Sequence, residues 1–182
     1  MKKFVIASLG LLALAAGAVA QTPDEAIERA LAPTTPQQKD AVSVVKWKAD
    51  GTYDTLKKGT GQLVCYDRSN ELGRTGFNVQ CTVLGNLPRV AQNRKFEAIS
   101  DKTARQAAID AAEKDGTRVK PVYGSPWIDM NGADKEHARI HRTIAIPGAT
   151  TASTGLPTDP KQGGAWIMDA GTTTAHIMIP GT

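Results

Sequence analysis

The chain has only two cysteines and three histidines, and after its first twenty positions it contains no long apolar run. A membrane-spanning helix needs about 20 consecutive apolar residues, so the sequence predicts no membrane span. Acidic and basic residues are interspersed, with no run of like charge beyond pairs such as Lys57 and Lys58, and the formal net charge is +4. Nucleic-acid-binding proteins concentrate Lys and Arg in one patch or stripe. We therefore expect no nucleic-acid partner.

The signatures of common catalytic machinery are missing as well. Ser125 is followed by Pro126, and a proline after a nucleophilic serine has no backbone amide to offer an oxyanion hole. No Walker-type phosphate loop occurs, and His137 is followed by Ala138 instead of the Glu of H-E-x-x-H. The sequence alone therefore does not decide whether the protein is an enzyme.

The first twenty residues have the pattern of a secretory signal peptide. A basic start (MKK) precedes an apolar stretch over residues 4–16, and Ala-Val-Ala at 18–20 suits cleavage by a signal peptidase. We expect residues 1–20 to be removed and residues 21–182 to form one exported domain, located in the periplasm or secreted. A chain of this length typically folds as one domain around its own core.

Cys65 and Cys81 are predicted to form a disulfide bond, because an oxidising compartment favours pairing of the two cysteines. A redox-active pair typically has the spacing C-x-x-C, and the spacing here is far wider. We interpret the bond as structural. Closing a loop of this size stabilises a fold by roughly 3 kcal/mol in the chain-entropy description.

Hydrophobic periodicity predicts an α+β fold with a mainly antiparallel sheet, a short N-terminal helix and one central helix. Thr22, Pro23 and Glu25 form a helix-start signature, and Ala recurs at helical spacing between positions 104 and 112, after Asp101 or Ser100 as the predicted cap. The expected strands cover residues 41–51, 61–68, 77–84, 117–130, 142–148, 165–169 and 174–179. Two prolines interrupt the strand at 117–130, so we expect it at a sheet edge.

The C-terminal segment gathers a Trp, two Met and one of the three His into a predicted hairpin. Alternation along a strand places Trp166 and Met168 on one face of its first strand, and His176 and Met178 on one face of its second. Because both faces are largely apolar, we expect the hairpin in the centre of the sheet. These four are the predicted binding residues, and imidazole and thioether donors suit Cu(I). The alternative is that the same side chains only fill the core.

A second candidate site contains the other two histidines. In a helix, His137 and His141 would lie one turn apart, which is the spacing of two zinc ligands. In a strand, the same residues would line a polar groove, and the segment also fits plain solvated surface. An envelope hydrolase would use one of these histidines with Asp129 or Glu136 as acid, base or metal ligand.

Several segments resemble an uncharacterised family of exported bacterial proteins. They are Trp47, GTGQLVC at 59–65, TDPKQGGAWIM at 158–168 and GTTTAHIMIP at 171–180. The C-terminal pattern Gly-Gly-x-Trp-x-Met … Gly-Thr-x-x-Ala-His-x-Met-x-Pro is the most specific part. Asp169 departs from the family, in which a large apolar or aromatic residue follows the Met. The resemblance implies one exported domain and carries no activity with it.

These features together predict an exported soluble protein that binds a small molecule, a metal such as copper or zinc, or another envelope component. The alternatives are the hydrolase and a non-catalytic structural or interaction protein. Burial distinguishes them, because binding requires the side chains of His176 and Met178 to reach the surface.

Overall fold

The computed structural model describes residues 22–180, so the predicted signal peptide lies outside the described residues. The helices are α1 (Pro23–Ala30), α2 (Leu87–Glu97), α3 (Lys102–Lys114) and α4 (Thr151–Thr154), with 3-10 turns η1 (Pro36–Gln38), η2 (Leu84–Asn86) and η3 (Pro160–Gln162). The strands are β1 (Ser43–Trp47), β2 (Tyr53–Lys57), β3 (Leu63–Asp67), β4 (Phe77–Val83), β5 (Pro126–Gly132), β6 (Arg139–Ala145), β7 (Trp166–Met168) and β8 (His176–Met178). No helix in this part of the chain is long and apolar enough to cross a bilayer.

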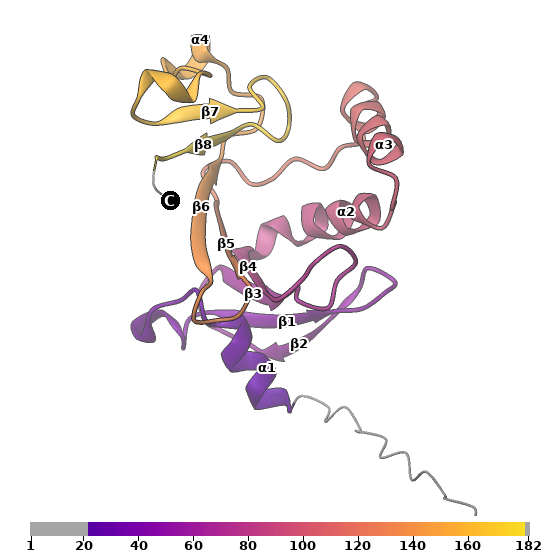
Figure 1. Cartoon of the computed structure of the whole chain (residues 1–182), viewed down its shortest axis with the longest axis vertical. Helices are drawn as coiled ribbons and strands as arrows, with labels where there is room; N and C mark the ends of the chain where they lie inside the picture. The colour runs from indigo at the N-terminus through magenta and orange to yellow at the C-terminus, as the bar shows by residue number, and fades with distance from the viewer. Residues whose placement is uncertain (1–21, 181–182) are drawn as a thin grey trace, which may run out of the picture.

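The eight strands form a single sheet in the order β2-β1-β3-β4-β5-β6-β8-β7. Its neighbours are antiparallel except for β1 and β3, which run parallel. In Figure 1, β1 and β2 cross the lower part of the molecule, β5 and β6 rise from them, and β7 and β8 lie at the top. The prediction of a mainly antiparallel sheet with accompanying helices is confirmed.

Side chains cap the first turns of α1 and α3. The Thr22 hydroxyl accepts a hydrogen bond from the Glu25 backbone amide, and the Glu25 carboxylate accepts one from the Thr22 amide at 2.9 Å. Asp101, one of the two predicted caps of α3, accepts from the amide of Ala104 at 2.7 Å. These contacts satisfy backbone donors that the first turn of a helix leaves unpaired.

The two faces of the sheet are covered by different helices around β1, β3 and β4. α1 packs Ala30 and Leu31 against one face, and α2 packs Leu87 and Val90 against the other. Successive strand residues point to opposite faces, so the same strands supply both clusters. The cluster under α1 also contains Val42, Val44, Cys65 and Cys81, and the cluster under α2 contains Val45, Val64 and Tyr66. A third cluster, near the C-terminal hairpin, contains Ile146, Ala149, Ile167 and Ala175.

The predicted disulfide bond between Cys65 and Cys81 is confirmed. The two residues lie directly opposite each other on β3 and β4, with their Cα atoms 4.1 Å apart. Both are fully buried beneath α1. The bond therefore joins neighbouring strands inside the core, where a structural role is expected.

The prediction of one central helix is wrong, because α2 precedes α3. The sequence of α2, LPRVAQNRKFE, has a weak apolar pattern because its buried side includes Arg89 beside Leu87 and Val90. Helical periodicity detects a stripe of apolar residues, so a helix that buries an arginine escapes it.

The prediction of an edge strand over residues 117–130 is also wrong. β5 begins only at Pro126 and lies inside the sheet, between β4 and β6. A proline at the first position of a strand leaves the later ladder hydrogen bonds intact. The segment before it is irregular, and its backbone amides at Val119 and Val122 donate to the side chains of Gln92 and Asn86 at 2.9 and 2.7 Å.

The prediction that the C-terminal hairpin lies in the centre of the sheet is wrong, because β7 is an edge strand. Its two faces differ in burial. Ile167 is 1 % exposed, whereas its neighbour Met168 is 37 % exposed. An apolar residue on an open face of an edge strand gives the same sequence pattern as one in a covered strand, so alternation alone did not distinguish them.

Candidate functional sites

The four predicted C-terminal residues come together on one face of the hairpin. Met168 pairs with His176, and Trp166 pairs with Met178, across the antiparallel strands β7 and β8. Residues directly opposite in such a pair project to the same side of the sheet. Ile167 pairs with Ile177 and points to the opposite side, into the third core cluster. The hairpin thus has a buried isoleucine face and a partly exposed face that carries sulfur and imidazole.

The structure separates the other two histidines. His141 lies on β6, opposite Asp129 on β5. His137 and Glu136 lie in the exposed turn between these strands, where the His137 ring Nδ1 is 2.7 Å from an Asp134 carboxylate oxygen. The alternative in which His137 and His141 lie one helical turn apart, at the spacing of two zinc ligands, is therefore wrong. No group of three or more His, Cys, Asp or Glu side chains that could hold a metal occurs between residues 22 and 180.

A cavity of about 890 Å³ lies where the parallel strands β1 and β3 end, between α1 and α2. We call it the Trp47 pocket. It is lined by Ala26, Ala30, Val44, Val45, Lys46, Trp47, Lys48, Ala49, Asp50, Gly51, Leu56, Asp67, Asn70, Glu71, Leu72, Ala91, Arg94, Lys95, Glu97 and Ala98. Its volume lies in the range of roughly 300–1,000 Å³ that is common for small-molecule sites.

Trp47 is held in place by aromatic neighbours. Its ring meets Tyr53 and Tyr66 edge to face, with centroids 5.2 and 5.9 Å apart. The Arg94 guanidinium carbon lies 5.3 Å from the indole centroid. The indole Nε1 is buried and donates to no acceptor within the described residues. A buried donor without an acceptor costs about 1–3 kcal/mol. The aromatic neighbours hold the Trp47 ring in place, while its indole N–H stays unsatisfied.

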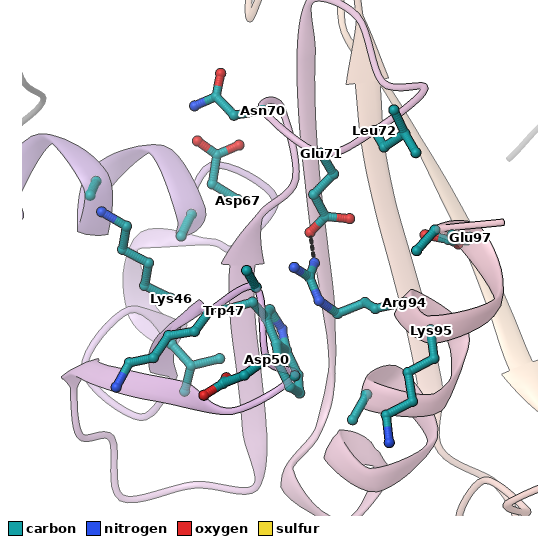
Figure 2. A pocket seen from close by; sticks show the side chains of 18 of the residues that line it. Lys46, Trp47, Asp50, Asp67, Asn70, Glu71, Leu72, Arg94, Lys95 and Glu97 are labelled. Atoms are coloured by element: carbon teal, nitrogen blue, oxygen red, sulfur yellow. Dashed lines mark hydrogen bonds and ion pairs between the residues drawn. The ribbon is translucent and has the colours of Figure 1, made fainter. Parts of the chain in front are cut away.

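Most of the charges around the pocket are paired with each other or with residues behind its wall. Arg94 binds Glu71, as Figure 2 shows, and Glu71 also accepts from Arg68 at 2.8 Å. Glu97 accepts from Arg68 and from Arg74. Arg68 is only 5 % exposed, so this cluster of three arginines and two carboxylates is anchored from beneath the pocket.

Two pocket lysines have no such partner. Lys46 and Lys95 are exposed, and neither ammonium group has a hydrogen-bond or ion-pair acceptor among the described residues. They lie on opposite sides of Trp47 (Figure 2). Leu72, which is 67 % exposed, adds an apolar side chain to the lining. The pocket therefore offers an aromatic and aliphatic lining with free positive charge on both sides.

A row of polar side chains crosses the middle of the sheet. Tyr66 on β3, Gln80 on β4, Asp129 on β5 and His141 on β6 are neighbours in register. The Tyr66 hydroxyl donates to the side-chain oxygen Oε1 of Gln80, and the side-chain Nε2 of Gln80 donates to the Asp129 carboxylate at 2.6 Å. Burial raises the pKa of the Asp129 carboxyl above its usual value, although Gln80, nearby arginines and His141 act in the opposite direction.

Comparison with protein families, curated proteins and solved structures finds no match to this chain. The resemblance to exported bacterial proteins therefore stays a prediction.

No sequence motif predicts the Trp47 pocket. Its lining residues come from α1, β1 and its turn, β2, the end of β3 with the loop after it, and α2, and none of these segments carries a recognisable motif. The only signal was Trp47 itself, since an isolated Trp followed by charged residues marks a partly exposed aromatic.

Proposed function

We propose that the protein is an exported binding protein and that its ligand is a small organic anion with an apolar or aromatic body, held in the Trp47 pocket. The observation that carries the proposal is a cavity of about 890 Å³ in which Trp47 and Leu72 lie beside two ammonium groups without acceptors. Small-molecule sites combine an apolar lining with a few polar groups that fix orientation.

The charges of the pocket favour an anion over a cation. The carboxylates of Glu71 and Glu97 are already bound to arginines, so they attract an incoming cation weakly. Lys46 and Lys95 remain available to an acidic group from either side of Trp47.

Calorimetric titration of the mature protein with aromatic carboxylates, and with the corresponding amides and amines, tests this proposal. We expect the carboxylates to bind about fivefold more tightly than the amides, because an exposed ammonium–carboxylate pair contributes up to about 1 kcal/mol. The amines should bind most weakly. Equal affinity for carboxylates, amides and amines would contradict the assignment of the ligand as an anion.

Matched variants locate the binding. Leu72→Ala is expected to weaken binding about tenfold through loss of apolar contact, whereas Tyr123→Ala, at a residue that is 68 % exposed and outside the pocket, should leave it unchanged. Lys95→Ala should reduce the preference for carboxylates, because only Lys46 then remains, and Lys102→Ala, on α3, should leave it unchanged. Binding that is insensitive to both pocket variants would refute the proposal.

One observation favours a hydrolase as a second candidate function. Asp129 carries a carboxyl whose pKa is raised by burial, and it faces His141 across β5 and β6. A carboxylic acid with a raised pKa beside an imidazole is a common pair for general acid–base chemistry. Hydrolysis of nitrophenyl esters and glycosides by the wild type, lost in Asp129→Asn and in His141→Gln, would support this function, and unchanged hydrolysis in both variants would exclude it.

A further inference from the structure

The C-terminal hairpin carries a second inference, which is independent of the Trp47 pocket. We propose that the thioethers of Met168 and Met178 and the imidazole Nε2 of His176 bind one Cu(I) ion. The pocket is lined by residues of β1 and its neighbours, near one end of the strand order, and the hairpin β7–β8 forms the other end. Figure 1 shows β1 and the hairpin at opposite ends of the molecule. Each site can therefore be removed without touching the other.

The backbone register brings the three donors together. Met168 lies directly across from His176, and Met178 is two residues farther along the same strand as His176. Side chains directly opposite in an antiparallel pair have Cβ atoms about 4.5–5.5 Å apart, and diagonal neighbours are still within reach of long side chains. Two flexible thioethers on either side of one imidazole can thus converge on a single ion.

The donor face is accessible. Met168 is 37 % exposed and lies on the edge strand β7, while His176 and Met178 are partly buried. Ile167, on the other face of the same strand, supplies the apolar contacts that attach the hairpin to the third cluster. The isoleucine face of the hairpin therefore packs into the core, and the face with the thioethers and the imidazole remains available to an ion.

The orientation of His176 is already that of a metal ligand. Its ring Nδ1 lies 2.8 Å from the backbone carbonyl oxygen of Thr174. A carbonyl only accepts hydrogen bonds, so Nδ1 carries the proton and the Nε2 of the neutral ring keeps its lone pair. Metal-binding histidines typically donate their second ring N–H to a carbonyl or carboxylate in this way. Nε2 has no hydrogen-bond partner among residues 22–180.

The carbonyl that orients His176 belongs to a segment held by helices α2 and α3. Arg89, which is 3 % exposed, donates to the hydroxyls of Thr173 and Thr174 at 2.8 and 2.7 Å. Glu113 accepts from the backbone amide of Thr173 at 3.1 Å. Two buried or partly buried charged side chains thus fix the strand entry immediately before His176. A preorganised support of this kind reduces the conformational entropy that ion binding would otherwise cost.

The donor set selects the ion. Thioether sulfur is a soft ligand that favours Cu(I), whereas Ca²⁺ and Mg²⁺ require oxygen ligands. Structural Zn²⁺ typically takes four Cys or His ligands, and the hairpin face has one imidazole and no thiolate. Trp166, opposite Met178, lies beside the proposed ion on the same face. An aromatic ring there adds contact with sulfur and limits access of water.

Titration of the mature protein with Cu(I) under a reductant, in competition with a chromophoric Cu(I) chelator, tests the proposal. We expect one ion per chain. Met168→Leu and Met178→Leu should each weaken binding by more than about tenfold, because substitution of residues that only contact a metal ligand already lowers metal affinity by about that factor. These substitutions conserve volume and cost less than about 1.5 kcal/mol of stability. Met130→Leu, on β5, is the matched control and should bind like the wild type.

A second readout keeps folding and binding separate. Addition of Ag(I), which resembles Cu(I) and is diamagnetic, should shift the NMR signals of the Met168 and Met178 methyl groups and of the His176 ring, while the Met130 methyl signal stays in place. Absence of one-to-one binding, or binding that both methionine variants retain, would overturn the proposal. A loss of affinity in Met130→Leu equal to that in Met168→Leu would overturn it too. None of these outcomes bears on the proposal of carboxylate binding in the Trp47 pocket, because the two sites share no residue.

Discussion

Replacement of Arg68 is expected to destabilise the fold more than replacement of any surface arginine. The Arg68 side chain is 6 % exposed; its Nε donates to Glu71 at 2.8 Å, its Nη2 donates to Glu97, and its Nη1 lies 3.5 Å from the Gln80 carbonyl oxygen. Removing one partner of a buried ion pair typically costs about 3–5 kcal/mol, because the remaining charge is left without compensation.

The structure places Arg68→Met at the lower end of that range. Glu71 keeps its contact with Arg94, and Glu97 keeps its contact with Arg74 at 3.2 Å, so each carboxylate retains one cation. We therefore expect a loss of about 3 kcal/mol in the free energy of unfolding. Arg68→Lys keeps the charge but not the planar set of donors, so it should lose less, about 1–2 kcal/mol.

Urea unfolding followed by circular dichroism measures these differences. Arg142→Met is the matched control, because Arg142 is exposed on β6 and surface substitutions usually change stability by less than about 0.5 kcal/mol. The loss in Arg68→Met should persist at high salt, since buried pairs are screened weakly. A loss below about 1 kcal/mol, or a lysine variant no more stable than the methionine variant, would refute the reasoning, because the cluster would then not depend on the guanidinium.

Three further perturbations have defined outcomes. Reduction of the Cys65–Cys81 bond should lower the free energy of unfolding by about 3 kcal/mol, as urea titrations with and without a phosphine reductant would show, and equal midpoints would contradict the chain-entropy account. The pKa of the Asp129 carboxyl is raised in the folded state, so its contribution to stability is present below the pKa of the unfolded chain and is lost as the pH rises through the pKa of the folded protein. Asp129→Asn should therefore flatten the pH dependence of the melting temperature in the acidic range. An unchanged slope in this variant would contradict the role of Asp129. Gly76→Ala should cost more than about 1 kcal/mol, since φ is +70° and the new Cβ would lie 2.4 Å from the Gly132 carbonyl oxygen; a thermal melt like that of the wild type would show that the strand end relaxes freely.

The parts of the fold that the sequence predicted are those with a local physical signal. The strands around Cys65 and Cys81 have β-branched and aromatic residues bounded by polar turns, and the structure contains both. Asp101 precedes a run of alanines at helical spacing and caps α3. In each case the hydrogen bonds and the apolar face belong to neighbours in sequence, so the pattern is readable without the rest of the chain.

The remaining features depend on contacts between distant segments. α2 buries Arg89, whose partners Thr173 and Thr174 lie far along the chain, so its sequence looks polar until the C-terminal segment is placed. The Trp47 pocket likewise forms from five segments and has no local pattern. Alternation puts Trp166 with Met168, and His176 with Met178, on one face of each strand, and the register shows that all four share one side. Their position at the sheet edge follows from strand order, which alternation does not encode.

The two proposed binding sites lie toward the ends of the sheet, on either side of the polar row through its middle. Gln80 and Asp129 are mostly buried and bind each other, so their hydrogen-bonding capacity is used internally. Groups without acceptors or with a free lone pair occur instead at Lys46 and Lys95 beside the first strands, and at His176 beside the last ones. Buried polar groups that satisfy one another stabilise a fold, whereas unsatisfied groups at an accessible surface remain available to a ligand. Substitutions in the central row should therefore change stability, and substitutions at either end should change one binding activity each.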